Sequence, residues 1–233
     1  MTQSSWGAII VGEAFDLEDW ADTLKPPFDP WVEIQGANTV LRSTSFDELT
    51  YGEQVHTRAL ALIERLNGAL AVLHKAKPIS FDGLVEITSS GQPLVIKFAQ
   101  FVAEGRSKVR AVGQVIEPDG KPIASPPAQA SEVQRWCELV ERHESLDDAL
   151  TYFAKPNWFD IYKALECLFL RVGGEESFLA LGWESKDEVL RLKRTANWAR
   201  HSRHKFEPPP DPMPIKEARE LLGRLIQRAL RKT

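Results

Sequence analysis

The sequence predicts an α+β fold, with a mostly antiparallel sheet and one long helix in the N-terminal half and an all-helical C-terminal half. Short runs rich in Val, Ile and Phe, separated by turn residues, occur only before residue 117. After Ala130, every periodic stretch has helical spacing. Because strands flank one helix instead of alternating with several, an antiparallel sheet is favoured over βαβ units.

The strands are predicted from short apolar runs bounded by turn residues. The first is Trp6–Val11, which a polar, Pro-rich excursion follows. Trp31–Gln35 and Thr39–Thr44 flank Gly36-Ala37-Asn38 and are expected to form a hairpin. Three later strands are expected at Leu84–Thr88, Leu94–Val102 and Lys108–Ile116.

A long amphipathic helix is predicted from Thr50 to about Lys75. Its apolar residues recur with the spacing of a single helix face. They are Val55, Ala59, Leu62, Ile63, Leu66, Leu70 and Leu73. Pro78 lies just beyond the predicted end, where a proline is expected.

The stretch Glu117–Ala130 is rich in Pro, Ala and Ser and has few side chains that could pack in a core. It predicts a linker over residues 118–130, between an α+β domain of unknown role at 1–117 and a helical domain at 131–233.

Six helices are expected in the C-terminal part: Ser131–His143, Asp147–Phe153, Asn157–Val172, Glu175–Leu181, Ser185–Arg203 and Ile215–Arg231. Asn157 and Ser185 are suited to cap their helices, and Asp147 and Asp148 are acids suited to a helix N-terminus. Trp136, Trp158 and Phe159 are predicted to be core residues.

Composition favours a globular, cytoplasmic protein. Hydrophobic residues make up 43% of the 233 residues and charged residues 27%. No signal peptide is expected at the N-terminus, and no apolar run approaches the roughly 20 residues of a membrane span. The two cysteines, Cys137 and Cys167, lie in apolar helical stretches and are expected to be buried thiols.

The net charge of −4 hides a basic segment. Lys186–Lys205 holds seven basic residues and two acidic ones, enough to bind phosphates. If this segment is one helix, Arg194, Asn197, His201 and His204 share roughly 80° of its circumference, opposite an apolar face. That face consists of Val189, Leu192, Ala196 and Ala199. Trp198 flanks the polar stripe and could stack on a base or pack on another helix.

The spacing Arg-x6-His at Arg194 and His201, with Asn197 between them, resembles the HEPN superfamily, whose hallmark is Arg-x4–6-His. The resemblance covers residues 131–233 and implies a HEPN-like helical bundle. Many such proteins are dimeric, metal-independent endoribonucleases of toxin–antitoxin and phage-defence systems, and others are inactive. The chain departs from the commonest pattern because Thr195, not Asn or Asp, follows the arginine.

By position, the resemblance makes Arg194, His201 and Asn197 the catalytic residues. Their basic and aromatic neighbours would contact the substrate: Lys193, Trp198, Arg200 and His204. Polar residues of an earlier helix would have counterparts in Asp160, Lys163 and Glu166. Histidine suits proton transfer because its ordinary pKa is about 6.5, and arginine donates paired hydrogen bonds to phosphate.

Other interpretations of the stripe stay open. A basic helix face is often only a solvated or partner-binding surface, so an inactive HEPN-like binding or dimerisation module and a nucleic-acid-binding regulator are both alternatives. No cofactor motif is present. His201 and His204 have no third ligand in the sequence pattern, so no metal site is predicted.

The expected partners are a second copy of the chain, RNA and an antitoxin or other protein, with no membrane. Homodimerisation is predicted because the apolar face of Ile215–Arg231 looks wide for a small bundle.

Overall fold

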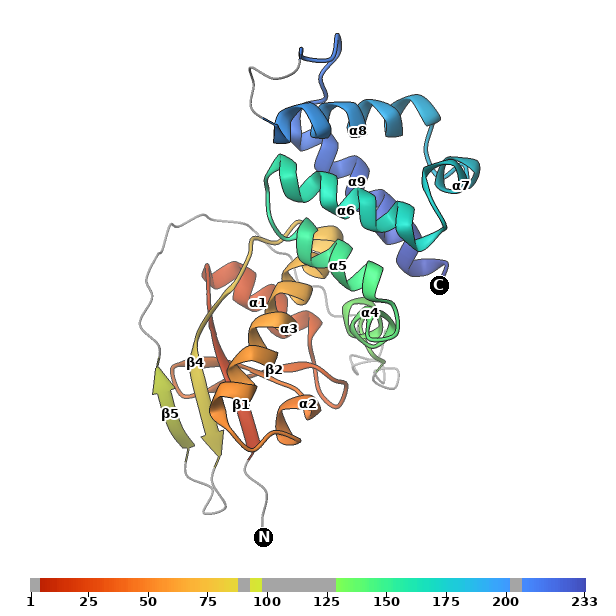
Figure 1. The fold of residues 1–233 in the computed structure, drawn as a ribbon. Helices are drawn as coiled ribbons and strands as arrows, with labels where there is room; N and C mark the ends of the chain where they lie inside the picture. Colours follow the sequence, from red (N-terminus) through yellow and green to blue (C-terminus); the bar gives the residue numbers. More distant parts are fainter. Residues whose placement is uncertain (1–4, 88–92, 98–128, 202–206) are drawn as a thin grey trace, which may run out of the picture.

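An antiparallel sheet in the N-terminal half and a helical C-terminal half together form an α+β fold (Figure 1). The structure is a computed structural model that describes residues 5–87, 93–97, 129–201 and 207–233. The five described strands follow the order β2-β3-β1-β4-β5, and every neighbouring pair is antiparallel. Their bounds are β1 Ser5–Val11, β2 Trp31–Gln35, β3 Asn38–Arg42, β4 Ser80–Ile87 and β5 Pro93–Lys97.

The sheet confirms the predicted hairpin, in which β2 pairs with β3 from Trp31↔Arg42 to Gln35↔Asn38. Gly36 has a positive φ of 61°, a conformation that glycine adopts without strain. The strand predicted at Leu94–Val102 is described only as far as Lys97. The strand predicted at Lys108–Ile116 lies outside the described residues.

The predicted long helix is α3 (Gly52–His74), which ends where Lys75 takes a left-handed conformation. Two shorter helices, α1 (Ala14–Thr23) and α2 (Thr44–Asp47), were not expected from the sequence. α1 is acidic, and few of its side chains are apolar and buried, so its periodicity is weak. Its Asp16 carboxylate is buried and accepts a hydrogen bond from the backbone N–H of Lys77.

All six predicted C-terminal helices are present, with some ends shifted. They are α4 Glu132–Val140, α5 Glu144–Phe153, α6 Trp158–Arg171, α7 Glu175–Ala180, α8 Lys186–Arg200 and α9 Ile215–Arg231. The two predicted caps are confirmed. Asn157 Oδ1 accepts from the Asp160 N–H at 3.0 Å, and Ser185 Oγ accepts from the Glu188 N–H at 3.2 Å.

The apolar side chains of the helical half are mostly buried within the chain. α9 buries Ala218, Leu221, Leu222, Leu225, Ile226, Ala229 and Leu230. Trp136 is buried as predicted, and Trp158 is partly buried against the core. The prediction for Phe159 is wrong, because its side chain is 51% exposed. It lies two residues, or about 200°, from Ile161, which begins the buried face of α6.

One continuous hydrophobic core joins the N-terminal and helical parts. α3 packs against α5, and the two helices approach so closely that a Cβ at Gly68 would lie 2.1 Å from the Leu150 carbonyl oxygen. Polar contacts reinforce this α3–α5 interface, as Arg65 donates to both Asp147 carboxylate oxygens at 2.6 and 2.8 Å. Of the predicted linker at 118–130, only residues 129 and 130 are among those described.

A second polar contact between the two parts comes from Gln134 on α4. Its Nε2 donates to the carbonyl oxygens of Lys25, Phe28 and Pro30 at 2.8–3.0 Å. Its Oε1 accepts from the Ser131 N–H and completes a capping box. One side chain thus caps a helix and fixes the Pro-rich loop that follows α1.

None of the helices in the described ranges is both long and apolar enough to cross a lipid bilayer.

Candidate active site at the end of helix α8

Helix α8 carries the predicted basic stripe. Its opposite face is held in the core by Val189, Leu192 and Ala196, all of which are buried as the sequence predicts. Thr195, the residue that departs from the commonest HEPN pattern, is also buried. Its Oγ1 accepts a hydrogen bond from the Met213 N–H at 3.0 Å. Thr195 therefore fastens the Pro-rich connection that runs back along α8.

The predicted end of this helix is wrong. α8 ends at Arg200, and His201 is its C-cap, with φ −93° and ψ 164°. The His201 N–H donates to the Trp198 carbonyl oxygen at 3.3 Å, which closes the last turn. The extended conformation of His201 interrupts the helix there, so α8 does not pass this residue. His201 thus lies at the helix end, and His204 lies outside the described residues.

The residues of the stripe and their neighbours on α8 differ in exposure and in their contacts. Arg194 is exposed, whereas Asn197, Trp198 and His201 are partly buried. Arg200 lies over the ring of Tyr162 on α6, with the guanidinium carbon 3.6 Å from the ring centroid. Its Nε donates to Asn197 Oδ1 at 3.1 Å. Two contacts therefore fix the plane of this guanidinium.

Lys193 is engaged within the chain. Its Nζ forms an ion pair with Glu175 and lies 6.0 Å from the centre of the Phe169 ring. A lysine held in this way contributes positive charge to the surface but is not poised for a new partner. The structure thus gives Lys193 a role in packing α6 and α7 against α8, beside its predicted role in substrate binding.

Helix α6 supplies the neighbouring polar residues. Asp160 is buried and belongs to the Asn157 cap, so it does not face the end of α8. Lys163 and Glu166 are at the surface, and the lysine Nζ donates to Glu166 Oε2 at 2.9 Å. This hydrogen bond, together with the Glu166 charge, raises the pKa of Lys163. Tyr152 also raises the lysine's pKa and Arg200 lowers it, so Lys163 lies within electrostatic reach of both.

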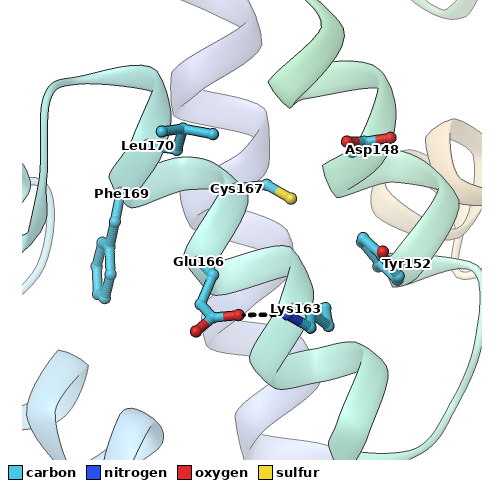
Figure 2. A pocket seen from close by; sticks show the side chains of 7 residues that line it. All are labelled: Asp148, Tyr152, Lys163, Glu166, Cys167, Phe169 and Leu170. Carbon is cyan, nitrogen blue, oxygen red and sulfur yellow. Dashed lines mark hydrogen bonds and ion pairs between the residues drawn. The ribbon is translucent and has the colours of Figure 1, made fainter.

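An open hollow of about 400 Å³ lies beside this ion pair, between α5 and α6 (Figure 2). It is lined by Asp148, Tyr152, Lys163, Glu166, Cys167, Phe169 and Leu170. The Asp148, Tyr152 and Cys167 side chains point into the space between the two helices, whereas Glu166 and Phe169 lie on the other flank of α6.

The two thiols do not suit nucleophilic chemistry. Burial raises the pKa of Cys137 to about 12 and that of Cys167 to about 11. Both therefore stay protonated near neutral pH, and the thiolate is the reactive form. The prediction of buried thiols holds for Cys137, while Cys167 is only partly buried at the edge of the hollow.

Sequence reasoning missed Tyr162, Asp148 and Tyr152 as members of this region. Tyr162 was missed because its spacing is that of the apolar residues of α6. Its position under Arg200 depends on the approach of α8. Asp148 was interpreted as a helix N-terminal charge. α5 begins earlier than predicted, at Glu144, so Asp148 lies one turn inside the helix. The i, i+4 spacing of Asp148 and Tyr152 was the available signal.

The chain matches no protein-family model, no curated protein and no solved structure. Within the described ranges, no group of three or more His, Cys, Asp or Glu side chains is placed to hold a metal ion. What the region offers chemically is a fixed arginine, a second exposed arginine and a histidine at one helix end. These groups suit the binding of a phosphodiester and the transfer of a proton.

Proposed function

We propose that the chain is a metal-independent endoribonuclease of the HEPN type that binds a phosphate of RNA at the end of α8. The observation that supports this most is the fixed Arg200 guanidinium beside His201. Stacking on Tyr162 and the Nε contact with Asn197 leave the two terminal nitrogens without an acceptor among the described residues. A planar fork held in this way can donate two hydrogen bonds to a phosphate with little further loss of entropy.

In the proposed reaction, His201 takes the proton from a ribose 2′-hydroxyl. The 2′-oxygen attacks the adjacent phosphorus, and the bond from phosphorus to the 5′-oxygen breaks. The departing 5′-oxygen takes a proton from the His201 of a second copy in a homodimer. Arg194 and Arg200 stabilise the charge that develops on the phosphate oxygens, and Asn197 positions Arg200. The products are a 2′,3′-cyclic phosphate and a 5′-hydroxyl.

The test is cleavage of a single-stranded RNA in EDTA, analysed for 2′,3′-cyclic phosphate ends. His201→Ala and Arg194→Ala should each lower the cleavage rate by about 100-fold or more, because each removes a group that acts in the transition state. Arg142→Ala is the matched control, since that arginine is exposed just beyond the C-terminal end of α4 and its loss should leave the rate unchanged. RNA with a 2′-deoxy residue at the cleavage point should stay intact.

Two outcomes would contradict this function. If the wild-type chain cleaves no RNA, the enzymatic proposal fails. If His201→Ala cleaves as fast as the wild type, His201 does not transfer the proton in the reaction.

A specific observation favours a second candidate, an inactive binding module or nucleic-acid-binding regulator. Lys193 and Arg200 already make contacts within the chain, as residues with a packing role would. For this candidate, RNA binding without cleavage is expected, and its affinity should fall steeply with salt concentration because released counterions drive phosphate binding.

The proposed setting is the bacterial cytoplasm, in stress response, a toxin–antitoxin pair or phage defence. The proposed homodimer cannot use the apolar face of α9, because that face is buried within the chain. Another surface must form the contact, and Phe159 is an exposed apolar side chain on α6. Light scattering should give a mass near twice the 26.2 kDa of one chain.

A further inference from the structure

The wall of the hollow that α5 provides carries two groups one turn apart. Asp148 and Tyr152 point to the same side of the helix (Figure 2). The Asp148 carboxylate has no hydrogen-bond or ion-pair partner within the described part of the chain, in contrast to Asp147, which Arg65 occupies. Asp148 therefore offers two acceptor oxygens to a ligand, and Tyr152 offers an aromatic ring beside them.

The electrostatic setting of Asp148 favours a ligand that donates hydrogen bonds. Desolvation, followed by the charges of Glu144 and Asp147, raises the pKa of Asp148. The Asp148 side chain is exposed, and a ligand that donates hydrogen bonds to it would stabilise the ionised carboxylate.

The wall that α6 provides suits a flat, apolar ring. Cys167 keeps a neutral thiol near neutral pH, and Leu170 is 75% exposed at the edge of the hollow. The hollow has a volume of about 400 Å³ and is open to solvent, so a planar base can enter it from the surface. Proteins that bind single-stranded RNA stack its bases on aromatic side chains and read their edges by hydrogen bonds.

Lys163 links the hollow to the proposed phosphate site. It lines the hollow together with Tyr152, and it directly follows Tyr162, the residue whose ring lies under Arg200. A nucleotide whose phosphate is held at Arg200 could therefore extend across Lys163 and place its base beside Tyr152. Among the four RNA bases, guanine alone presents adjacent N1–H and N2–H donors, which match the two oxygens of one carboxylate.

We propose that the hollow between α5 and α6 is a guanine subsite, in which Tyr152 stacks on the base and Asp148 accepts hydrogen bonds from N1–H and N2–H. The inference rests on the proposed function for the position of the phosphate. The subsite adds a base preference to that function: the nucleotide whose phosphate is held at Arg200 is a guanosine.

The test measures binding of 3′-GMP, 3′-AMP, 3′-UMP, 3′-CMP and inorganic phosphate to the full chain by calorimetry. Wild-type protein should bind 3′-GMP about tenfold more tightly than the other nucleotides. Asp148→Asn should remove this preference, because the amide presents a donor where the base needs a second acceptor. Glu144→Gln removes the same charge from an exposed position of α5 and should keep the preference.

The aromatic wall is tested with two substitutions at one position. Tyr152→Ala should weaken 3′-GMP binding severalfold, whereas Tyr152→Phe keeps the ring and should bind as the wild type does. Equal affinity for all four nucleotides, or a guanine preference that survives Asp148→Asn, would overturn the subsite.

The binding assay requires no cleavage, so the two proposals can fail separately. RNA cleavage without a preference for 3′-GMP would overturn the subsite alone. A preference for 3′-GMP that depends on Asp148, in a chain that cleaves no RNA, would overturn the enzymatic proposal and support the subsite.

Discussion

Two arginines show how one residue type is used differently in two regions. Arg65 lies in the α3–α5 interface, where its side chain is 16% exposed and its fork is matched to both oxygens of Asp147. Arg200 lies at the end of α8, where a tyrosine ring and an amide oxygen hold it and no acceptor among the described residues meets its terminal nitrogens. An arginine whose N–H donors are paired within the chain stabilises the fold. An arginine that is held in place but has unpaired donors can bind a ligand.

The same contrast separates two neighbouring aspartates of α5. Asp147 faces α3 and is paired with Arg65, and Asp148 faces the hollow, beside Tyr152. One residue along a helix turns the side chain by about 100°, which here is the difference between the interface and the surface. The comparison predicts that changes in the α3–α5 interface alter stability and changes at the hollow and the end of α8 alter binding.

The largest effect is expected at Gly68. Gly68→Ala should lower the free energy of unfolding by about 3 kcal/mol or more, because the new methyl group would meet the Leu150 backbone oxygen and force α3 and α5 apart. The matched control is Gly223→Ala, also within a helix, whose methyl group would meet only the Phe153 ring at 3.3 Å. Urea denaturation measures both, and equal effects at the two glycines would contradict this description of the interface.

Intermediate effects should distinguish the two arginines. Arg65→Ala should cost about 2 kcal/mol, because Asp147 loses two charged hydrogen bonds while it is only 31% exposed. Arg200→Ala should cost no more than about 1 kcal/mol, the usual value of an arginine–aromatic contact. RNA binding should show the opposite order. If Arg65→Ala weakened RNA binding more than Arg200→Ala, the division between the two regions would be wrong.

The smallest effect concerns Asp148 and pH. Its pKa is raised in the folded chain, so the folded state holds the proton more tightly than the unfolded state does. Stability therefore falls as the pH rises through and above the ordinary pKa of 3.8. Asp148→Asn should raise stability at pH 7 by no more than about 0.5 kcal/mol, since the residue is largely exposed. The gain should disappear near pH 3, as thermal melts at both pH values can show.

The elements that depend on local spacing could be predicted from the sequence alone. The hairpin, the long helix α3, the six C-terminal helices and the caps at Asn157 and Ser185 follow from contacts between residues two to four positions apart. The same spacing placed Arg194 and Asn197 on the surface side of α8. Elements with few apolar residues, such as α1, were not found because their local pattern is weak.

Contacts between distant parts of the chain determine which side chains are already paired and which can bind a ligand. Arg65 and Asp147 are 82 residues apart in the chain, and no local pattern relates them. The approach of α6 to α8 places Tyr162 under Arg200, and the return of the chain brings the Met213 N–H to Thr195. Spacing along a helix fixes the direction of each side chain, but the partner it meets depends on how distant elements pack.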